Sequence, residues 1–254
     1  MNLSAQRVFH PIGHQLVRLK SVDSTNNYAM ASVHEGLATH GTVISAFEQT
    51  AGRGQRKRKW SSAPGQNITL SIVLEPVFLR PIEQFSLSAC IAVACHEFLN
   101  KYAPMGWTIK WPNDLFWNDR KAGGILIESI IRGNQWLYAV AGIGINVNQV
   151  RFPVLSPRPV SLKQITGTTF DPEVLALSLC DLVEKKFCDL RTSGHEEILG
   201  QYNRVLFRAG SRVTLSKDGK IFETTVLGVT PLGQLLCSDK TQRIFEFGEV
   251  SWVL

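Results

Sequence analysis

The chain has 254 residues, of which 44% are hydrophobic and 19% are charged. This composition excludes an intrinsically disordered protein and supports one large domain with a small companion. No apolar run approaches the roughly 20 residues that span a bilayer, and the N-terminus lacks the apolar segment of a signal peptide. We therefore expect a soluble, cytoplasmic protein without a membrane partner.

The first 208 residues predict a mixture of strands and helices. Asp23 or Ser24 caps a first helix, and residues 67–74 alternate apolar and polar side chains like a strand with one buried face. Residues 81–101 carry almost no internal charge, which predicts a helix buried along most of its girth. The other predicted elements are strands at residues 41–47, 107–111, 123–132 and 136–148, and helices at residues 171–190, capped by Asp171-Pro172-Glu173, and 195–207.

Near Ala209 the pattern changes to short β segments separated by turns. Lys217-Asp218-Gly219 lies between two of these segments, and Asp-Gly is a strong hairpin signal. Several short strands in so few residues indicate a small β-barrel of the SH3 kind. We therefore divide the chain into a larger domain at residues 1–208 and a C-terminal domain at residues 209–254.

The net charge of +6 is concentrated in one short segment, the basic loop from Gly52 to Trp60 (GRGQRKRKW). Taken alone, this loop is compatible with a nucleic-acid patch, a localisation signal, a solvated turn or a loop that closes over phosphates. Its glycines let backbone N–H groups approach a ligand, its arginines offer planar forks for phosphate oxygens, and Trp60 offers a flat surface for a base.

Two further segments carry candidate site residues, and each also has a plain structural interpretation. Lys110-Trp111-Pro112-Asn113-Asp114 places a lysine, an amide and a carboxylate at a strand end, where α/β proteins build sites, although Pro-Asn-Asp is also an ordinary turn signal. Lys121 precedes Ala122-Gly123-Gly124 and an apolar strand, so it either reaches into a cleft or is exposed at the start of a strand.

Several classes of site are excluded. The chain has no P-loop and no Gly-x-Ser-x-Gly, and the dinucleotide fingerprint around Gly142 and Gly144 is incomplete because position 147 is valine. The five cysteines are odd in number, widely spaced and without a Cys-x-x-Cys pair, which predicts reduced thiols. The six histidines form no zinc pattern, so we predict no metal-ligating residues.

In their order along the chain, these motifs resemble the biotin protein ligase family, in the form without an N-terminal DNA-binding domain. The resemblance extends from about Val22 to Leu254 and is carried by STN near residue 25, Q-x-x-GRG-x-R-x-R-x-W, KWPND, RK-x-GGIL-x-E and GIGIN-x-N. It implies an α+β catalytic domain with a mixed sheet, related to class II aminoacyl-tRNA synthetases and lipoate ligases, followed by an SH3-like β-barrel.

The resemblance also implies an ATP-dependent ligase with biotin and ATP as substrates and Mg²⁺ as cofactor. Such enzymes make biotinyl-5′-AMP and pass the biotinyl group to one lysine of a biotin carboxyl carrier protein, part of a biotin-dependent carboxylase. The carboxylate of biotin itself attacks the α-phosphorus, so the site needs cations more than a protein nucleophile. The basic loop is then a lid over the adenylate.

The same resemblance assigns roles to individual residues. Lys121 neutralises charge at the biotin carboxylate or the α-phosphate, Asp114 orients the carrier lysine or assists a metal ion, and Arg56 completes the catalytic set. The residues matched to biotin are Ser24, Thr25, Asn26, Gln49, Gly52, Arg53, Gly54, Gln55, Lys121, Gly124, Leu126, Gly142 and Gly144. Those matched to ATP are Arg53, Arg56, Arg58, Trp60, Asn67, Lys110, Asn113 and Asn146.

Two positions of the basic loop depart from the family pattern GRGRRGR. Gln55 stands in the place of an arginine and cannot neutralise an anion, which puts retention of the adenylate in question. Lys57 stands in the place of a glycine and is less free to adopt positive φ. The segment before Ser24 fits no pair of helices, so we expect no DNA partner, and the sequence leaves a homodimer open.

Three other functions are weighed against the ligase. A nucleic-acid-binding protein would use residues 53–59 as its patch but leaves the segments around Lys121 and Gly142 unexplained. A lipoate or octanoyl transferase is a sister enzyme, which competition between biotin and lipoate separates from a biotin ligase. A non-catalytic biotin sensor is disfavoured because Lys121 and Asp114 are both present.

Overall fold

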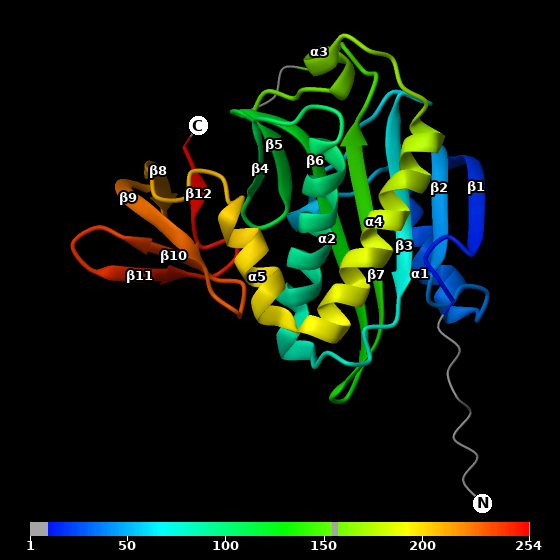
Figure 1. Cartoon of the computed structure of the whole chain (residues 1–254), viewed down its shortest axis with the longest axis horizontal. Coiled ribbons are helices and arrows are strands. Elements are labelled where there is room, and N and C mark those ends of the chain that lie inside the picture. The colour runs from blue at the N-terminus through cyan, green and yellow to red at the C-terminus, as the bar shows by residue number, and fades with distance from the viewer. Residues whose placement is uncertain (1–9, 154–156, 254) are drawn as a thin grey trace, which may run out of the picture.

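The computed structural model describes residues 10–153 and 157–253, and its centre is a seven-stranded mixed sheet with the strand order β1-β2-β3-β7-β6-β5-β4 (Figure 1). Only β1 and β2 pair in parallel within this sheet, and every other neighbouring pair is antiparallel. The strands are β1 (Gln15–Val22), β2 (Thr42–Gln49), β3 (Asn67–Leu74), β4 (Trp107–Lys110), β5 (Asp114–Trp117), β6 (Arg120–Arg132) and β7 (Gln135–Asn146).

Helices cover both faces of this sheet. On one face lie α2 (Gln84–Asn100), α4 (Pro172–Ser193) and α5 (His195–Arg204), which cross the front of the sheet in Figure 1. On the other face α1 (Thr25–His34) packs in a second apolar cluster with β2, β3 and β7. All eight residues of β3 are therefore buried, and the prediction of a single buried face for this strand is wrong because α1 covers the other one.

Local signals placed several elements correctly. Asp171 caps α4, since its Oδ1 accepts hydrogen bonds from the N–H groups of Glu173 at 2.8 Å and Val174 at 3.4 Å. Twelve of the residues of α2 are buried, which confirms the expected buried helix. The sequence did not predict β1, β5 or the short helix α3 (Leu162–Thr166), and α5 ends three residues earlier than expected.

A second, five-stranded antiparallel sheet lies beside β4 and α5 and has the order β11-β10-β9-β8-β12 (Figure 1). Its strands are β8 (Arg212–Lys217), β9 (Lys220–Val229), β10 (Leu235–Ser238), β11 (Gln242–Phe245) and β12 (Ser251–Trp252). Asp218 and Gly219 both adopt positive φ in the turn between β8 and β9, which confirms the predicted hairpin. The α+β fold with a small antiparallel C-terminal β unit is as the resemblance implied.

The two sheets share one continuous apolar core, which joins residues such as Leu215 and Val226 to the large helical layer. Trp111 Nε1 donates to the carbonyl of Gly233 at 2.8 Å, and Asn203 hydrogen-bonds both backbone groups of Val229. The domain boundary near residue 209 therefore stays a prediction.

Candidate active site

A single cavity gathers most of the residues that the sequence singled out. It is bounded by the start of α1, the basic loop, the ends of β4 to β7 and the last turn of the C-terminal sheet. The predicted residues that line it are Ser24, Thr25, Asn26, Gln49, Arg53, Gly54, Gln55, Arg56, Arg58, Trp60, Lys110, Asn113, Asp114, Lys121, Gly124, Leu126, Gly142 and Gly144. Gly52, Asn67 and Asn146 do not line it.

A network of polar side chains forms the floor of the cavity at the start of α1. Gln49 Oε1 accepts hydrogen bonds from the backbone N–H of Thr25 at 2.8 Å and from its hydroxyl at 3.1 Å. Ser71 Oγ lies 2.8 Å from Thr25 Oγ1 and 2.6 Å from Asn26 Oδ1. Ser24, Thr25, Asn26 and Ser71 are all buried, so their donors and acceptors are fixed in direction and suited to a polar ligand ring.

Two glycines of strand β7, Gly142 and Gly144, leave room for side chains that pack against this strand. A methyl group at Gly142 would collide with the Asn26 side chain, and one at Gly144 would lie only 2.5 Å from Cε2 of Trp60. Trp60 therefore packs directly over Gly144, and its indole Nε1 is buried with no hydrogen-bond partner in the described part of the chain. The Gly-x-Gly of this strand serves close packing of side chains and does not open a helix as a dinucleotide fingerprint does.

Cations and one carboxylate meet on the opposite wall. Lys121 Nζ lies 2.6 Å from Asp114 Oδ1, and both side chains are half-buried. Lys110 Nζ lies 5.3 Å from the ring centre of Phe116 and 5.4 Å from that of Trp252. Burial lowers the pKa of Lys110 to about 8; Asp114 opposes the shift, while the positive charges of Lys121 and Arg58 add to it.

Asn113 supports this wall from the turn between β4 and β5. Its side-chain amide donates a hydrogen bond to the backbone carbonyl of Ile125. Its backbone carbonyl accepts a hydrogen bond from the backbone N–H of Ile125 at 3.1 Å. Asn113 thus ties the turn that carries Asp114 to the strand that carries Lys121.

The basic loop is closed by its own backbone. The N–H of Gly54 donates to the carbonyl of Arg58 at 2.7 Å, and that of Trp60 donates to the carbonyl of Gly52 at 2.9 Å. This hydrogen bond requires glycine at position 52, because a side chain there would collide with the carbonyl oxygen of Trp60. The positive φ in the loop is at Arg56 (54°) and not at Lys57.

The sequence reasoning missed the contribution of the C-terminal sheet to this cavity. Arg56 Nη1 donates to the carbonyl of Gly248 at 3.1 Å, and its guanidinium lies 5.7 Å from the ring centre of Phe247. Val250, Ser251 and Trp252 also line the cavity, as does Pro157 from the segment after β7. These residues are far from the basic loop in sequence and belong to no local motif, so no sequence signal identified them.

Asn67 and Asn146 stand opposite one another in the register of β3 and β7, outside the cavity. Asn67 Oδ1 accepts from the N–H of Val147 at 3.0 Å, and its Nδ2 donates to Gln149 Oε1 at 2.7 Å. Asn146 Nδ2 donates to the carbonyl of Val160 at 3.1 Å. Both amides therefore hold the chain that follows β7, and their assignment to ATP stays a prediction.

Among residues 10–153 and 157–253, no cluster of three or more His, Cys, Asp or Glu side chains is arranged to hold a metal ion. The five cysteines are free thiols, as expected from their spacing.

In the same described ranges, no helix is both long enough and apolar enough to cross a membrane.

Known proteins with similar sequences and structures are consistent with this site. Residues 19–146 match the Biotin/lipoate A/B protein ligase family. The chain is 36% identical over 229 residues to the biotin--[acetyl-CoA-carboxylase] ligase of Paracoccus denitrificans, covering 86% of this chain and 92% of that protein. It is 31% identical over 229 residues to the bifunctional ligase/repressor BirA of Bacillus spizizenii, covering 89% of this chain and 70% of BirA.

The fold is likewise similar to that of the biotin protein ligase from Aquifex aeolicus in complex with biotin and ATP. The TM-score is 0.79 at 26% identity, over 94% of this chain and 98% of that one. Half of the chain matches the family itself, and the match covers 92% of the Paracoccus ligase and 70% of the Bacillus protein. The chain therefore belongs to the biotin/lipoate A/B protein ligase family.

Proposed function

We propose that this protein is a biotin protein ligase, which makes biotinyl-5′-AMP from biotin and ATP and transfers the biotinyl group to a lysine of a biotin carboxyl carrier protein. The observation that carries the proposal is one cavity whose lining combines the hydrogen-bonded Thr25 and Gln49, the Lys121–Asp114 pair and residues of the basic loop. Relatives named biotin--[acetyl-CoA-carboxylase] ligase and a structural neighbour that contains biotin and ATP support it.

The chemistry fits the composition of the cavity. A carboxylate oxygen of biotin attacks the α-phosphorus of ATP, the bond to the bridging oxygen breaks, and pyrophosphate leaves. The carrier lysine then attacks the acyl carbon of the adenylate and AMP leaves. The first step brings two anions together, so Lys121 and the arginines of the basic loop lower its barrier by neutralising charge.

We assign the polar floor to the ureido ring of biotin and Leu126 to its apolar part. Lys121 would then lie at the reacting oxygens. Asp114 holds the Lys121 ammonium and would accept a hydrogen bond from the amine of the carrier lysine. Trp60, Arg56, Arg58 and Lys110 form the nucleotide side, and the buried, unpaired indole N–H of Trp60 is one donor available there.

Mg²⁺ is proposed to enter with ATP. Magnesium sites commonly use one or two carboxylates together with substrate phosphates instead of an all-protein cage. Among the described residues, Asp114 is the one carboxylate in the cavity lining, which suits an ion held mainly by the phosphates. In this role Mg²⁺ would neutralise the leaving pyrophosphate.

The cytoplasm is proposed as the compartment of this protein, and the five free thiols support a reducing environment.

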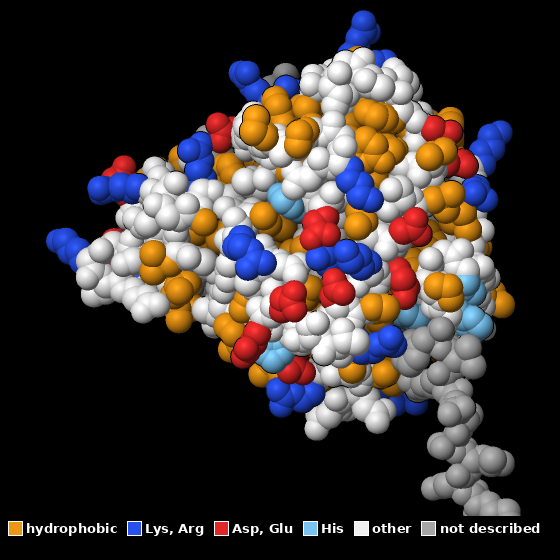
Figure 2. Space-filling model, in the orientation of Figure 1, with side chains coloured by type: hydrophobic (Ala, Val, Ile, Leu, Met, Phe, Trp, Pro, Cys, Tyr) orange, Lys and Arg blue, Asp and Glu red, His pale blue; other side chains and the backbone are white. Residues whose placement is uncertain are grey.

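A homodimer and the absence of DNA binding are further proposals. On the face drawn in Figure 2, acidic and basic side chains are interspersed over the helices, without the extended basic patch that a nucleic-acid-binding protein would favour.

The decisive experiment is incubation with biotin, Mg-ATP and a biotin carboxyl carrier domain, followed by intact mass of the carrier. We expect a mass gain of one biotinyl group, none when the carrier lysine is replaced by arginine, and no reduction in the presence of excess lipoate. An unmodified carrier, together with no biotin-dependent exchange between pyrophosphate and ATP, would contradict the proposed function. Lipoyl transfer in place of biotinyl transfer would assign the chain to the lipoate branch of its family.

A further inference from the structure

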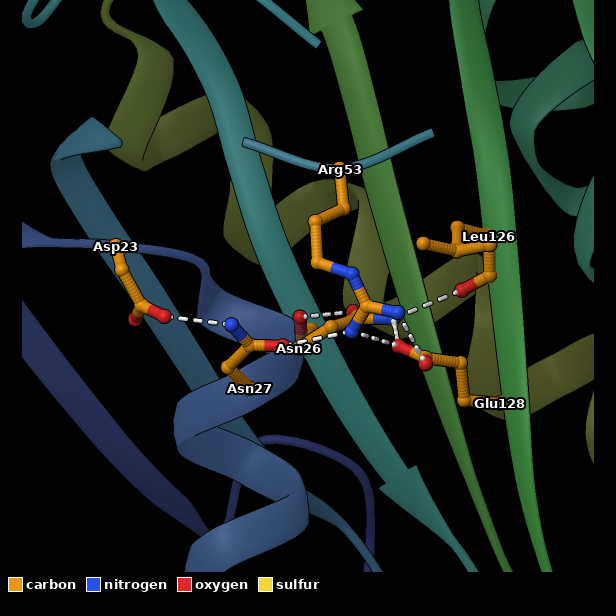
Figure 3. Close-up of polar contacts among 7 residues, drawn as sticks. Asp23, Asn26, Asn27, Arg53, Leu126 and Glu128 are labelled. Atoms are coloured by element: carbon orange, nitrogen blue, oxygen red, sulfur yellow. Dashed lines mark hydrogen bonds and ion pairs between the residues drawn. The ribbon is translucent and has the colours of Figure 1, made fainter. Parts of the chain in front are cut away.

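Arg53 is the first cation of the basic loop, and its guanidinium points towards Glu128 on strand β6 (Figure 3). Nη2 lies 2.8 Å from Glu128 Oε1 and Nη1 lies 3.0 Å from Glu128 Oε2, which is a two-pronged ion pair. Nη1 also donates to Asn27 Oδ1 at 2.6 Å, and Asn27 is in turn held by Asp23. The planar fork of Arg53 is therefore already occupied by protein groups.

Glu128 connects this ion pair to the floor of the cavity. Its Oε2 accepts a second hydrogen bond from Asn26 Nδ2 at 2.9 Å, and the same amide donates to the carbonyl of Leu126 at 3.2 Å. Asn26 is only 3% exposed and lies directly over Gly142. One carboxylate thus fixes both the base of the basic loop and the asparagine at the start of α1.

We propose that Glu128 is a positioning residue of the biotin site, which acts through Asn26 and Arg53, and that the Arg53 side chain holds the loop instead of binding nucleotide phosphate. This inference rests on the proposed function, because it concerns how the biotin side of that cavity is built. The other loop cations that line the cavity are Arg56, Arg58 and Lys59, and these are left to face the nucleotide.

The signs of the charges make the proposal testable. Glu128 is a carboxylate beside a cavity that must accept two anions, and Arg53 neutralises it. Removing Arg53 alone leaves that negative charge unpaired and repulsive, whereas removing both charges leaves the site neutral. If Arg53 instead bound a phosphate, removing Glu128 as well would restore nothing.

The experiment compares Arg53→Gln, Glu128→Gln and the double variant in biotin-dependent exchange of pyrophosphate with ATP. We expect Glu128→Gln to raise KM for biotin about tenfold, with KM for ATP and kcat within about twofold of wild type. Arg53→Gln should be more impaired than Glu128→Gln, and the double variant should return to the level of Glu128→Gln. A double variant at least as impaired as Arg53→Gln, or a KM increase for ATP without one for biotin, would overturn the proposal.

A second readout needs no ligand and no activity. The amides of Gly54 and Trp60 are hydrogen-bonded within the loop, so hydrogen exchange of a peptide covering residues 50–60 reports how firmly the loop is held. We expect faster hydrogen exchange there in both single variants, with hydrogen exchange outside the loop and the start of α1 unchanged. The control is Glu223→Gln, which breaks the 2.8 Å Arg212–Glu223 pair in the C-terminal sheet and should leave loop exchange as in wild type.

The two readouts separate the inference from the proposed function. Unchanged loop exchange in both single variants would remove the positioning role, whatever the activity. Suppose instead that hydrogen exchange of the loop becomes faster in the variants, while the wild-type protein shows no biotin-dependent exchange of pyrophosphate with ATP. This result would support the positioning role of Glu128 and refute the ligase activity.

Discussion

Lys121 Nζ lies 2.6 Å from Asp114 Oδ1, so a cation and a carboxylate on the neighbouring strands β6 and β5 face one another inside the cavity. The pair holds the lysine extended and restricts its rotamers before any ligand binds. A preorganised cation of this kind stabilises charge that develops in a transition state without further reorganisation. In the proposed function the two residues have different tasks, because Lys121 would act on the phosphoryl oxygens and Asp114 on an incoming amine.

Replacing Lys121 by alanine should abolish adenylate formation without unfolding the protein. Loss of one preorganised donor costs roughly 3–4 kcal/mol, or on the order of a hundredfold to a thousandfold in kcat. The unpaired Asp114 adds repulsion against the phosphates. Biotin-dependent pyrophosphate exchange measures the effect, with Arg212→Ala as control because Arg212 pairs with Glu223 between strands β8 and β9 of the C-terminal sheet. Exchange within about twofold of wild type would exclude the catalytic role of Lys121.

The lowered pKa of Lys110 predicts a pH dependence of stability. Burial lowers the pKa of this amine from 10.5 to about 8 in the folded chain. The unfolded chain therefore binds more protons between about pH 8 and 10.5, and the cost of the buried ammonium, fully present below pH 8, is relieved as the pH rises through this window. We expect Lys110→Met to raise the melting temperature of the ligand-free protein at pH 7 and to lose that advantage by about pH 10.

Thermal unfolding of wild type and Lys110→Met at matched pH values tests this expectation. Lys110→Arg is the control, because an arginine stays charged throughout the window and cannot relieve the cost by losing a proton. An equal melting-temperature difference between wild type and Lys110→Met at pH 7 and pH 10 would show that Lys110 is not the group that titrates.

Gly144→Ala should displace Trp60 and impair the nucleotide side of the cavity. The added methyl group would lie 2.5 Å from Cε2 and 2.6 Å from Cζ2 of the indole, closer than packed carbon atoms approach. Forcing such a group into packed surroundings costs about 1–3 kcal/mol. We expect a lower melting temperature and a higher KM for ATP.

The matched control is Gly200→Ala in helix α5. Its nearest neighbouring atom would be 3.8 Å from the new methyl group, so no collision arises. Alanine favours a helix over glycine by up to about 1 kcal/mol, so this variant should be at least as stable as wild type. If both variants behaved alike, close packing of Trp60 on Gly144 could not be the reason for the glycine.

The sequence predicted what local chemistry dictates. The Asp171 cap, the Asp218-Gly219 hairpin and the buried helix α2 each follow from a few neighbouring residues, and each is present. Strand β1 was missed because it lies at the edge of the sheet, where half-exposed side chains leave no clear hydrophobic alternation.

The candidate site was only partly predictable for a related reason. The family motifs brought most residues of the cavity together, but Glu128 meets Arg53 from 75 positions away and Gly248 meets Arg56 from 192 positions away. Such contacts depend on the path of the whole chain, which no short pattern records. Asn67 and Asn146, which the resemblance matches to ATP, hydrogen-bond the backbone outside the cavity, and their role towards a nucleotide stays a prediction.

Gln55 stands where the family pattern has arginine, and its surroundings give the difference a physical meaning. The residue lines the cavity, and its Oε1 is buried without a hydrogen-bond partner among the described residues. An acceptor in this state offers nothing to a negative phosphate, whereas an arginine fork could add a charge-assisted hydrogen bond of about 1.5–3 kcal/mol. We therefore expect Gln55→Arg to slow the release of biotinyl-adenylate by roughly tenfold to 150-fold.

The measurement is the dissociation rate of biotinyl-adenylate from wild type, Gln55→Arg and Gln55→Met. Methionine keeps the length of the side chain but removes the unpaired acceptor and carries no charge, so it isolates the contribution of charge from that of shape. Slower release in Gln55→Arg alone would assign the effect to the added cation, and slower release in both variants would assign it to loss of the unpaired acceptor. Unchanged or faster release in Gln55→Arg would mean that Arg56, within the loop turn, and Arg58, directly after it, already supply the charge that retains the adenylate.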